Sequence, residues 1–145
     1  MEVWELTPWE ELDMVLRLVM AALAGGLIGY ERESAEKPAG LRTNLLVCVG
    51  AALITIVSIH GFGASSDPSR VAAGIVVGIG FLGAGTIIRY RGAVLGLTTA
   101  ATIWSVAAIG LALGAGLYLI AAITAVMVLI ALRFPVGPRH HDSDS

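Results

Sequence analysis

The sequence predicts an all-α integral membrane protein, a bundle of five transmembrane helices with its N-terminus outside and its C-terminus in the cytoplasm. Hydrophobic residues make up 57% of the 145-residue chain and charged residues only 14%. The mean hydropathy is +0.84, which is high for a soluble domain, and a globule of this size leaves too much surface exposed to hide so many apolar side chains. We expect residues 1–134 to form one transmembrane domain and residues 135–145 to form a polar, disordered tail.

Apolar stretches account for the expected helices in order. The first three cover residues 12–30, 45–59 and 71–88. The fourth, residues 97–134, is too long for one span, since about 20 residues cross the hydrocarbon core. It must therefore fold back, and the glycines within residues 114–116 mark the turn. Of the five resulting helices, the second and the fourth are expected to be the shortest.

Basic residues predict the orientation of the bundle. With five spans, seven basic residues fall on one side of the membrane: Arg32, Lys37, Arg42, Arg89, Arg91, Arg133 and Arg139. The other side carries Arg70 and most of the acidic residues, so the positive-inside rule places the N-terminus outside. On that outer side, Asp67 is expected to cap the helix that Pro68 opens.

Glycines crowd the third apolar stretch, and a nucleotide-binding role for them can be set aside. Gly78, Gly80 and Gly83 match the pattern G-x-G-x-x-G of dinucleotide-binding folds. That fingerprint requires a soluble βαβ unit and an acidic residue about 20 positions later. The chain has no carboxylate between Asp67 and Asp142, so we expect no nucleotide site.

Two roles for the glycines stay open. Glycines four residues apart let helix backbones approach closely in lipid, where no hydrophobic drive brings helices together. The pairs with this spacing are Gly25/Gly29, Gly74/Gly78 and Gly110/Gly114. We favour this packing interpretation. The alternative is that the segment from Gly80 through Gly83 to Gly85 breaks the third helix, so that free carbonyls face a cavity or a pore.

Charged residues lie in and near the first helix. Asp13 and Arg17 are four residues apart with the acid first, the favourable order for an ion pair on one helical face. An unpaired charge in a span costs at least ~2.5 kcal/mol on insertion scales, so we expect Arg17 to pair or to reach outward. A denser group follows the helix: Glu31, Arg32, Glu33, Glu36, Lys37 and Arg42. It is either a solvated surface or a salt-bridged cap that Arg89 and Arg91 can join.

No catalytic or metal-binding constellation is evident in the sequence. Cys48 is the only cysteine and lies in an apolar stretch, so it is expected to be buried. His60 stands alone at a helix end, and no carboxylate lies deep in any span. We therefore expect no enzyme, no metal site and no cofactor, and this pattern argues against a carboxylate-centred ion transporter.

Four motifs together resemble the membrane domain of the MgtC/SapB family. They are "ERESAEKPAGLRTN", "DPSR", "GIGFLGAGTIIR" and "GLTTAATIWSVAAIGLALGAGLY", in order within residues 16–132. The resemblance implies a five-helix protein of the bacterial inner membrane that is associated with adaptation to low magnesium and, in some pathogens, with survival inside host cells. Better-known members are thought to modulate other membrane proteins, including ATP synthase, rather than to carry Mg²⁺. Longer members have a soluble C-terminal domain, so short SapB-type members are the closer analogue.

The family signature supplies candidate functional residues. The signature also covers residues that we do not count among the candidates: Gly40, Leu41, Phe81, Gly96, Ala100, Thr102 and Trp104. The binding candidates are Glu31, Arg32, Lys37, Arg42, Thr43, Asp67, Arg70, Arg89, Thr98 and Thr99. The candidates for helix packing or for a carbonyl-lined site include three glycines that come from their spacing rather than from the signature: Gly25, Gly29 and Gly74. The others, which the signature covers, are Gly78, Gly80, Gly83 and Gly85. Asp67 and Thr98 also suit helix starts, and helix packing is the default role for Trp104.

The leading functional hypothesis is a non-enzymatic, oligomeric membrane bundle that binds and regulates another membrane protein during magnesium limitation. Its expected partners are the lipid bilayer, a second copy of the chain and a membrane protein such as ATP synthase or a transporter. No nucleic acid is expected. The alternative is a small oligomeric channel or transporter for Mg²⁺ or another ion, which would use backbone carbonyls of the glycine segment.

Overall fold

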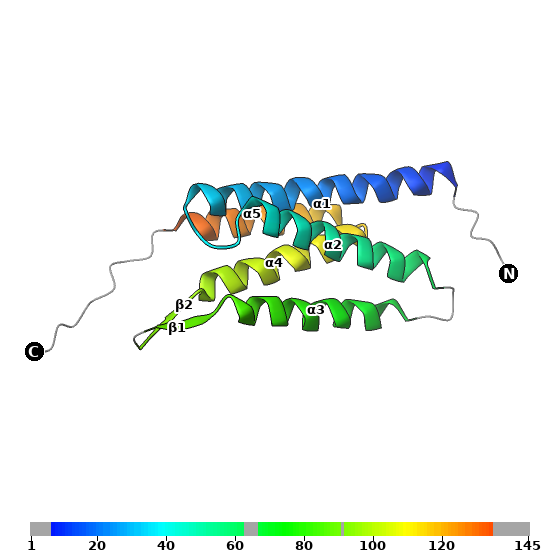
Figure 1. The fold of residues 1–145 in the computed structure, drawn as a ribbon. Helices are drawn as coiled ribbons and strands as arrows, with labels where there is room; N and C mark the ends of the chain where they lie inside the picture. Colours follow the sequence, from blue (N-terminus) through cyan, green and yellow to red (C-terminus); the bar gives the residue numbers. More distant parts are fainter. Residues whose placement is uncertain (1–6, 63–66, 91, 135–145) are drawn as a thin grey trace, which may run out of the picture.

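The computed structural model describes residues 7–62, 67–90 and 92–134. Five helices and one short hairpin follow each other along the chain (Figure 1): α1 (Pro8–Ser34), α2 (Leu41–His60), α3 (Pro68–Gly85), β1 (Ile88–Tyr90), β2 (Ala93–Leu95), α4 (Leu97–Gly114) and α5 (Tyr118–Arg133). Helices α1 to α4 are long and apolar enough to cross a membrane, and α5 is a shorter apolar helix. The expected helical membrane bundle is confirmed, and the chain is a multi-pass membrane protein.

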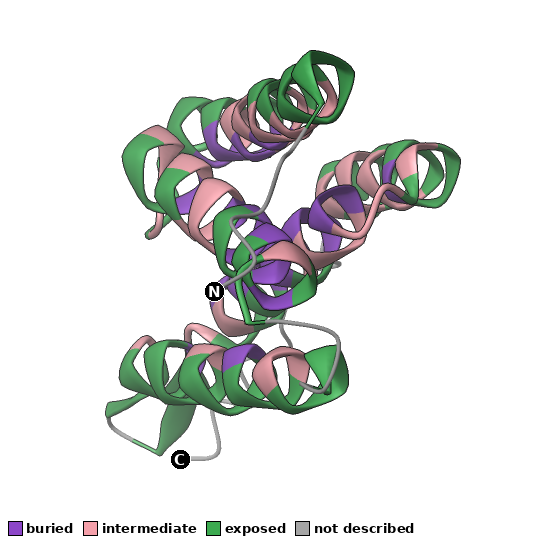
Figure 2. Ribbon diagram, turned by 90° about the vertical axis from the view of Figure 1, so that its right-hand side faces the viewer, coloured by how far each residue is buried: buried purple, intermediate pink, exposed green. Residues whose placement is uncertain are grey.

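Helix α4 is the centre of the bundle. Nine of its residues are buried, against two in α3 and one in α5. It contacts each of the other four helices, whereas α3 packs mainly on α4 and less on α2. Figure 2 shows the buried residues gathered in the middle of the bundle, with one helix standing apart. The main core includes Cys48, as the sequence predicts, together with Ile28, Val106 and Ile109.

Glycines allow α2 to touch both of its main neighbours. Four of them lie directly on α2: Gly25 and Gly29 of α1, and Gly110 and Gly114 of α4. A Cβ atom at Gly25 would lie 2.6 Å from the carbonyl oxygen of Asn44, and one at Gly114 would lie 2.5 Å from that of Ala52. Since real Cβ atoms do not come so close to backbone oxygens, these contacts require glycine.

The glycines of α3 are placed differently. Gly74, Gly78, Gly80 and Gly85 have no atom within 4 Å of an added Cβ. Gly83 is the exception, because its Cβ position lies 3.6 Å from the carbonyl oxygen of Ala100 in α4. The expected packing at Gly74 and Gly78 is therefore not found between the described residues, because α3 meets α4 along Ile75 and Gly83 instead.

Helix α3 also ends earlier than the sequence predicts. It continues unbroken to Gly85, so the alternative of an unwound segment from Gly80 to Gly85 is wrong. The expectation that the helix reaches residue 88 is wrong as well. Ile88 begins β1, which pairs antiparallel with β2. The run Thr86, Ile87, Ile88 is β-branched, and such residues favour strands over helices.

Other local predictions agree with the structure. Helix α4 ends at Gly114, and Gly116 has a φ of +81°, a left-handed turn conformation that glycine adopts without strain. The shortest helix, however, is α5 with 16 residues, not α2 with 20 or α4 with 18. Residues 135–145, expected to form the tail, lie outside the described residues, as does Arg91.

Asp67 caps α3 as expected. Its side chain accepts a hydrogen bond of 2.9 Å from the backbone N–H of Ser69, and Pro68 is the first residue of the helix. Hydrogen bonding to the Ser69 side chain and backbone lowers the pKa of the Asp67 carboxyl. Because the pKa is lowered, the cap stabilises the fold fully at pH values above the ordinary pKa of aspartate. This stabilisation is lost as the pH falls through the lowered pKa.

Alanine substitutions at two glycines test the close contacts of α2. Gly25→Ala is expected to lower the free energy of unfolding by about 1–3 kcal/mol, the usual effect of overpacking, because its Cβ meets a backbone oxygen at 2.6 Å. Gly74→Ala is the matched control. It has open space and is expected to gain up to about 1 kcal/mol from helix propensity. Unfolding of the purified protein in detergent measures both, and equal stabilities would contradict the contact.

Candidate functional site

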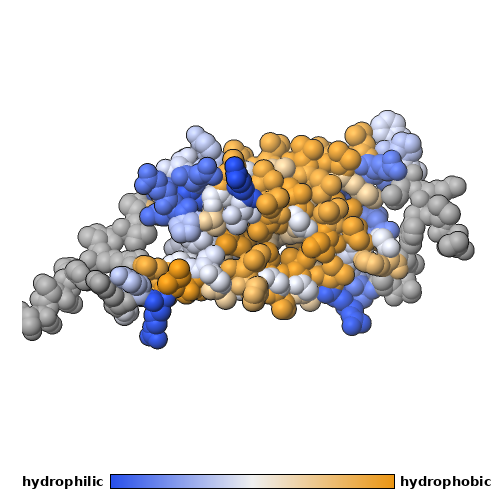
Figure 3. Space-filling model, in the orientation of Figure 1, coloured by the Kyte–Doolittle hydropathy of each residue, from blue (hydrophilic) through white to orange (hydrophobic). Residues whose placement is uncertain are grey.

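Polar residues gather at the two ends of the bundle. Figure 3 shows a hydrophobic middle between hydrophilic ends. The hairpin end holds β1, β2 and the connection between α1 and α2, and the opposite end holds the start of α1 and the turn between α4 and α5 (Figure 1). The sequence-predicted candidates divide between these ends, so they do not form one site.

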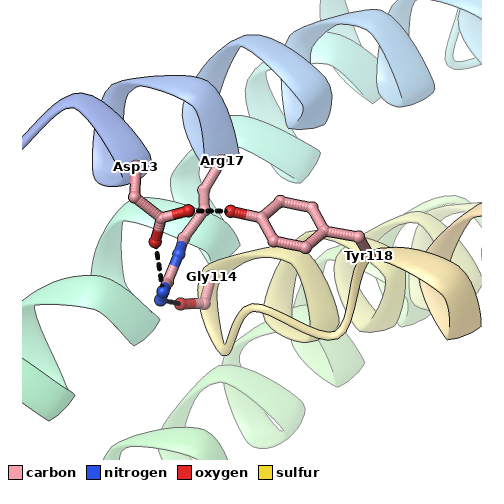
Figure 4. A network of polar contacts seen from close by, with 4 residues as sticks. All are labelled: Asp13, Arg17, Gly114 and Tyr118. Atoms are coloured by element: carbon pink, nitrogen blue, oxygen red, sulfur yellow. Dashed lines mark hydrogen bonds and ion pairs between the residues drawn. The ribbon is translucent and has the colours of Figure 1, made fainter. Parts of the chain in front are cut away.

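A network at the opposite end joins α1 to the turn between α4 and α5 (Figure 4). Asp13 forms the expected ion pair with Arg17 and accepts a hydrogen bond from the hydroxyl of Tyr118. Arg17 Nη1 donates a hydrogen bond of 2.9 Å to the carbonyl oxygen of Gly114. That carbonyl lies in the last turn of α4, where helical hydrogen bonds run out. Arg17 therefore has two partners within the bundle.

The same network borders a pocket of about 350 Å³. The residues that line it are Trp9, Glu10, Asp13, Met14, Arg17 and His60. The pocket brings both signs of charge and an imidazole together, so it can form hydrogen bonds with polar groups. Within residues 7–62, 67–90 and 92–134, however, no three His, Cys, Asp or Glu side chains are arranged to hold a metal ion. The sequence did not indicate that His60 lies near Asp13 and Arg17, because only the packing of α2 against α1 brings these residues together.

The candidates at the hairpin end differ in exposure. Arg32 is only 5% exposed, and its Nε has no hydrogen-bond partner. Glu31 is half-buried, and its Oε2 is also without a partner. The exposed candidates at this end are Lys37, Arg42, Thr43, Arg89 and Thr98, whereas Thr99 is buried. Asp67 and Arg70 are exposed at the far end of α3.

Of the two alternatives for the charged residues after the first helix, the salt-bridged cap is not found among the described residues of the hairpin end. Asp13–Arg17 is the one ion pair recorded among the described residues. Glu33 instead accepts a hydrogen bond of 2.9 Å from the backbone N–H of Leu41. It thereby satisfies one of the free N–H groups at the start of α2. Most acidic and basic side chains of this stretch are therefore exposed to solvent, or bonded to the backbone as Glu33 is, rather than paired with one another.

Asn44 is a functional candidate that sequence reasoning missed. Its side chain is fully buried, and its amide nitrogen donates to the carbonyl oxygens of Ala39 and Gly40. Its Oδ1 has no partner. Fully buried polar atoms usually have one, so this atom sets Asn44 apart. An amide near the start of an otherwise apolar span was the available signal.

Two aromatic residues of the signature lie on the surface. Phe81 of α3 is 81% exposed, and Trp104 of α4 is 50% exposed, so helix packing does not account for Trp104 within the described chain. Trp104 borders a small hollow between α3 and α4 together with Val76 and Ala108. Gly80 lies one turn after Val76 and is open. We call the surface formed by Val76, Gly80, Trp104 and Ala108 the α3–α4 face.

Comparison with known proteins identifies relatives in several bacteria. The model of the MgtC family matches residues 18–136. The putative magnesium transporter YhiD of Escherichia coli K12 is 46% identical over 128 residues, which are 83% of this chain and 60% of YhiD. SapB of Bacillus subtilis is 41% identical over 139 residues, 90% of this chain and 58% of SapB. MgtC of Brucella abortus is 54% identical over 112 residues, 77% of this chain and 47% of MgtC.

These relatives are longer than the aligned region. The chain spans about half to three fifths of their length. No solved structure matches the chain.

Substitution of Asp13 tests the network at the opposite end. Asp13→Asn keeps the size of the side chain but leaves the Arg17 guanidinium without its counter-charge. We expect a loss of about 1.5–3 kcal/mol in the free energy of unfolding, the usual range for hydrogen bonds to charged groups. The double variant Asp13→Asn with Arg17→Gln is expected to be more stable than Asp13→Asn alone, since no uncompensated charge is left. Additive losses in denaturant unfolding would contradict the coupling.

Proposed function

Because the chain belongs to the MgtC family, we propose that it is a non-enzymatic protein of the bacterial inner membrane that acts in adaptation to low magnesium by binding and modulating other membrane proteins. The family and the name of the Escherichia coli relative connect the chain with magnesium. The observation that carries the proposed mode of action is the exposure of Trp104, a signature residue, on the α3–α4 face.

The α3–α4 face has the features of a helix-binding surface in lipid. Large aromatic side chains are enriched among the residues that dominate binding energy. Gly80 has open space around it, so the backbone of another helix can come close at that point. Trp104 and Ala108 are exposed beside it on α4. A partner helix laid on this surface would cover a signature tryptophan that α3 leaves half uncovered.

The distribution of charge supports an inside location for the hairpin end. At that end Lys37 lies just before α2, and Arg42 is in the first turn of α2. Arg89 lies in β1, and Arg133 is the last residue of α5. Arg17 and Arg70 are the described arginines toward the opposite end. We place the hairpin end in the cytoplasm and the start of α1 outside, following the positive-inside rule. A partner at the α3–α4 face, whether ATP synthase, a transporter or a second copy of the chain, would then also be an inner-membrane protein.

In-cell crosslinking tests the proposed partner surface. The chain is expressed in a bacterium that lacks its own MgtC-family gene and grows poorly at low magnesium, with a photoreactive amino acid at position 104. We expect restored growth and a crosslinked product that contains another membrane protein. Gly80→Leu is expected to reduce both by roughly tenfold, because the added side chain holds the partner backbone away and losing the burial of about two methylenes costs that much.

Two matched positions serve as controls for that experiment. A photoreactive group at Ile123, which is exposed on α5, is expected to give no such product. Gly78→Leu, on another side of α3, is expected to leave the product unchanged. A product that contains only the chain itself would replace modulation of another protein by self-association, and no product at position 104 would contradict the proposed surface.

Transport of Mg²⁺ is the second candidate function, favoured by the name of the Escherichia coli relative. The helical course of α3 as far as Gly85 argues against it, because most carbonyls of the glycine segment are then already hydrogen-bonded. Those of Gly83 and Ala84 accept hydrogen bonds from the backbone N–H groups of Thr86 and Ile87. Reconstituted in liposomes with an enclosed Mg²⁺-sensitive dye, the purified chain is expected to give no flux above protein-free vesicles. Flux that Gly83→Leu abolishes would overturn the proposal of a regulator, since that substitution disturbs the contact of Gly83 with Ala100.

A further inference from the structure

A large apolar groove lies between α2 and α3. Its volume is about 540 Å³, and Gly50 of α2 and Gly74 and Gly78 of α3 form part of its walls. None of these three glycines has an atom within 4 Å of an added Cβ. Gly74 and Gly78 lie two residues from Val76, hence on another side of α3 from the α3–α4 face. The groove is therefore a separate surface of the bundle.

The size of the groove decides between kinds of occupant. Helix α3 is 18 residues long, and a straight helix of that length and about 10 Å diameter fills roughly 2,000 Å³. A whole transmembrane helix would therefore lie mostly outside a groove of about 540 Å³ and could not enter it fully. A single hydrocarbon chain is narrow enough to do so. Its methylenes would restore the van der Waals contacts that the open walls otherwise lack.

Basic and hydroxyl groups stand at the hairpin end of this groove. Leu46 and Val47 line it, and Arg42 and Thr43 lie one turn before them on α2. Both are exposed. Among the described residues, the recorded ion pair is that of Asp13 and Arg17, so Arg42 is not held by a carboxylate. The groove thus has apolar walls and a cationic mouth.

We propose that the α2–α3 groove binds an anionic phospholipid, with one acyl chain along Gly50, Gly74 and Gly78 and the phosphate on Arg42. The planar guanidinium matches a phosphate group by two parallel hydrogen bonds. Basic sites between transmembrane helices recognise anionic head groups in this way. The glycines leave room for the chain, and the charge selects the head group. This site is independent of the proposed protein partner.

Native mass spectrometry of the purified chain in detergent tests the site. Phosphatidylglycerol and phosphatidylcholine with identical acyl chains are titrated separately. We expect phosphatidylglycerol to bind roughly fivefold more tightly, the contribution of one basic residue near an anionic lipid. Arg42→Gln is expected to abolish this preference. Gly78→Leu is expected to weaken the binding of both lipids by roughly tenfold, because the position has room for a Cβ atom and the added side chain takes the place of about two buried methylenes of the lipid.

Two variants are matched controls for the lipid measurement. Arg133→Gln removes an exposed arginine at the end of α5, and Gly80→Leu adds a side chain on α3 outside the groove. Both are expected to bind lipid as the unchanged chain does. Equal binding of the two lipids, or equal effects of Arg42→Gln and Arg133→Gln, would overturn the proposal. So would a Gly78→Leu variant that keeps its lipid but changes the mass of the oligomer, since the groove would then belong to a second copy.

A failure of the lipid proposal can be told apart from a failure of the proposed partner surface, because different variants test them. Gly78→Leu addresses the groove, and Gly80→Leu addresses the α3–α4 face. Circular dichroism in detergent is expected to show that each variant keeps its helix content, since leucine has a higher helix propensity than glycine.

Discussion

Direct contact between the backbone of α2 and the glycine faces of α1 and α4 is the constraint on which the bundle depends. Lipid is as apolar as the side chains, so helices in a membrane associate through close packing and polar bonds rather than through a hydrophobic drive. At Gly25 and Gly114 the backbones of α1 and α4 come so close to α2 that a Cβ atom would not fit between them. Because α4 also contacts α3 and α5, this three-helix core positions the remaining elements.

The polar side chains follow from that core. Arg17 and Asn44 lie toward opposite ends of the spans, and both donate to carbonyl oxygens near helix ends, those of Gly114 and Gly40. Arg17 thereby joins α1 to the end of α4, whereas Asn44 joins the start of α2 to the connection before it. The middle of the bundle is hydrophobic (Figure 3). The buried Nε of Arg32 and Oδ1 of Asn44, both toward the hairpin end, have no hydrogen-bond partner.

Helix α3 departs from this pattern because little of it is buried. Only Ile75 and Gly83 are enclosed, and two different surfaces are left on its sides. The α3–α4 face offers an aromatic side chain and an open glycine, which suits another helix. The α2–α3 groove has apolar walls and a basic residue at its end, which suits a lipid. Both surfaces arise from one cause, the loose attachment of a glycine-rich helix to a tightly packed core.

The sequence by itself determined the class of protein, the turn after Gly114, the cap at Asp67 and the pairing of Asp13 with Arg17. These features depend on composition or on contacts within a few residues along the chain. Only the tertiary structure decided which glycines are covered, that Asn44 is buried and that His60 approaches Asp13. A spacing of four residues marks one face of a helix, but a helix that is apolar all round carries no signal for which neighbour that face meets. For that reason Gly25 and Gly74 look alike in the sequence and differ in the fold.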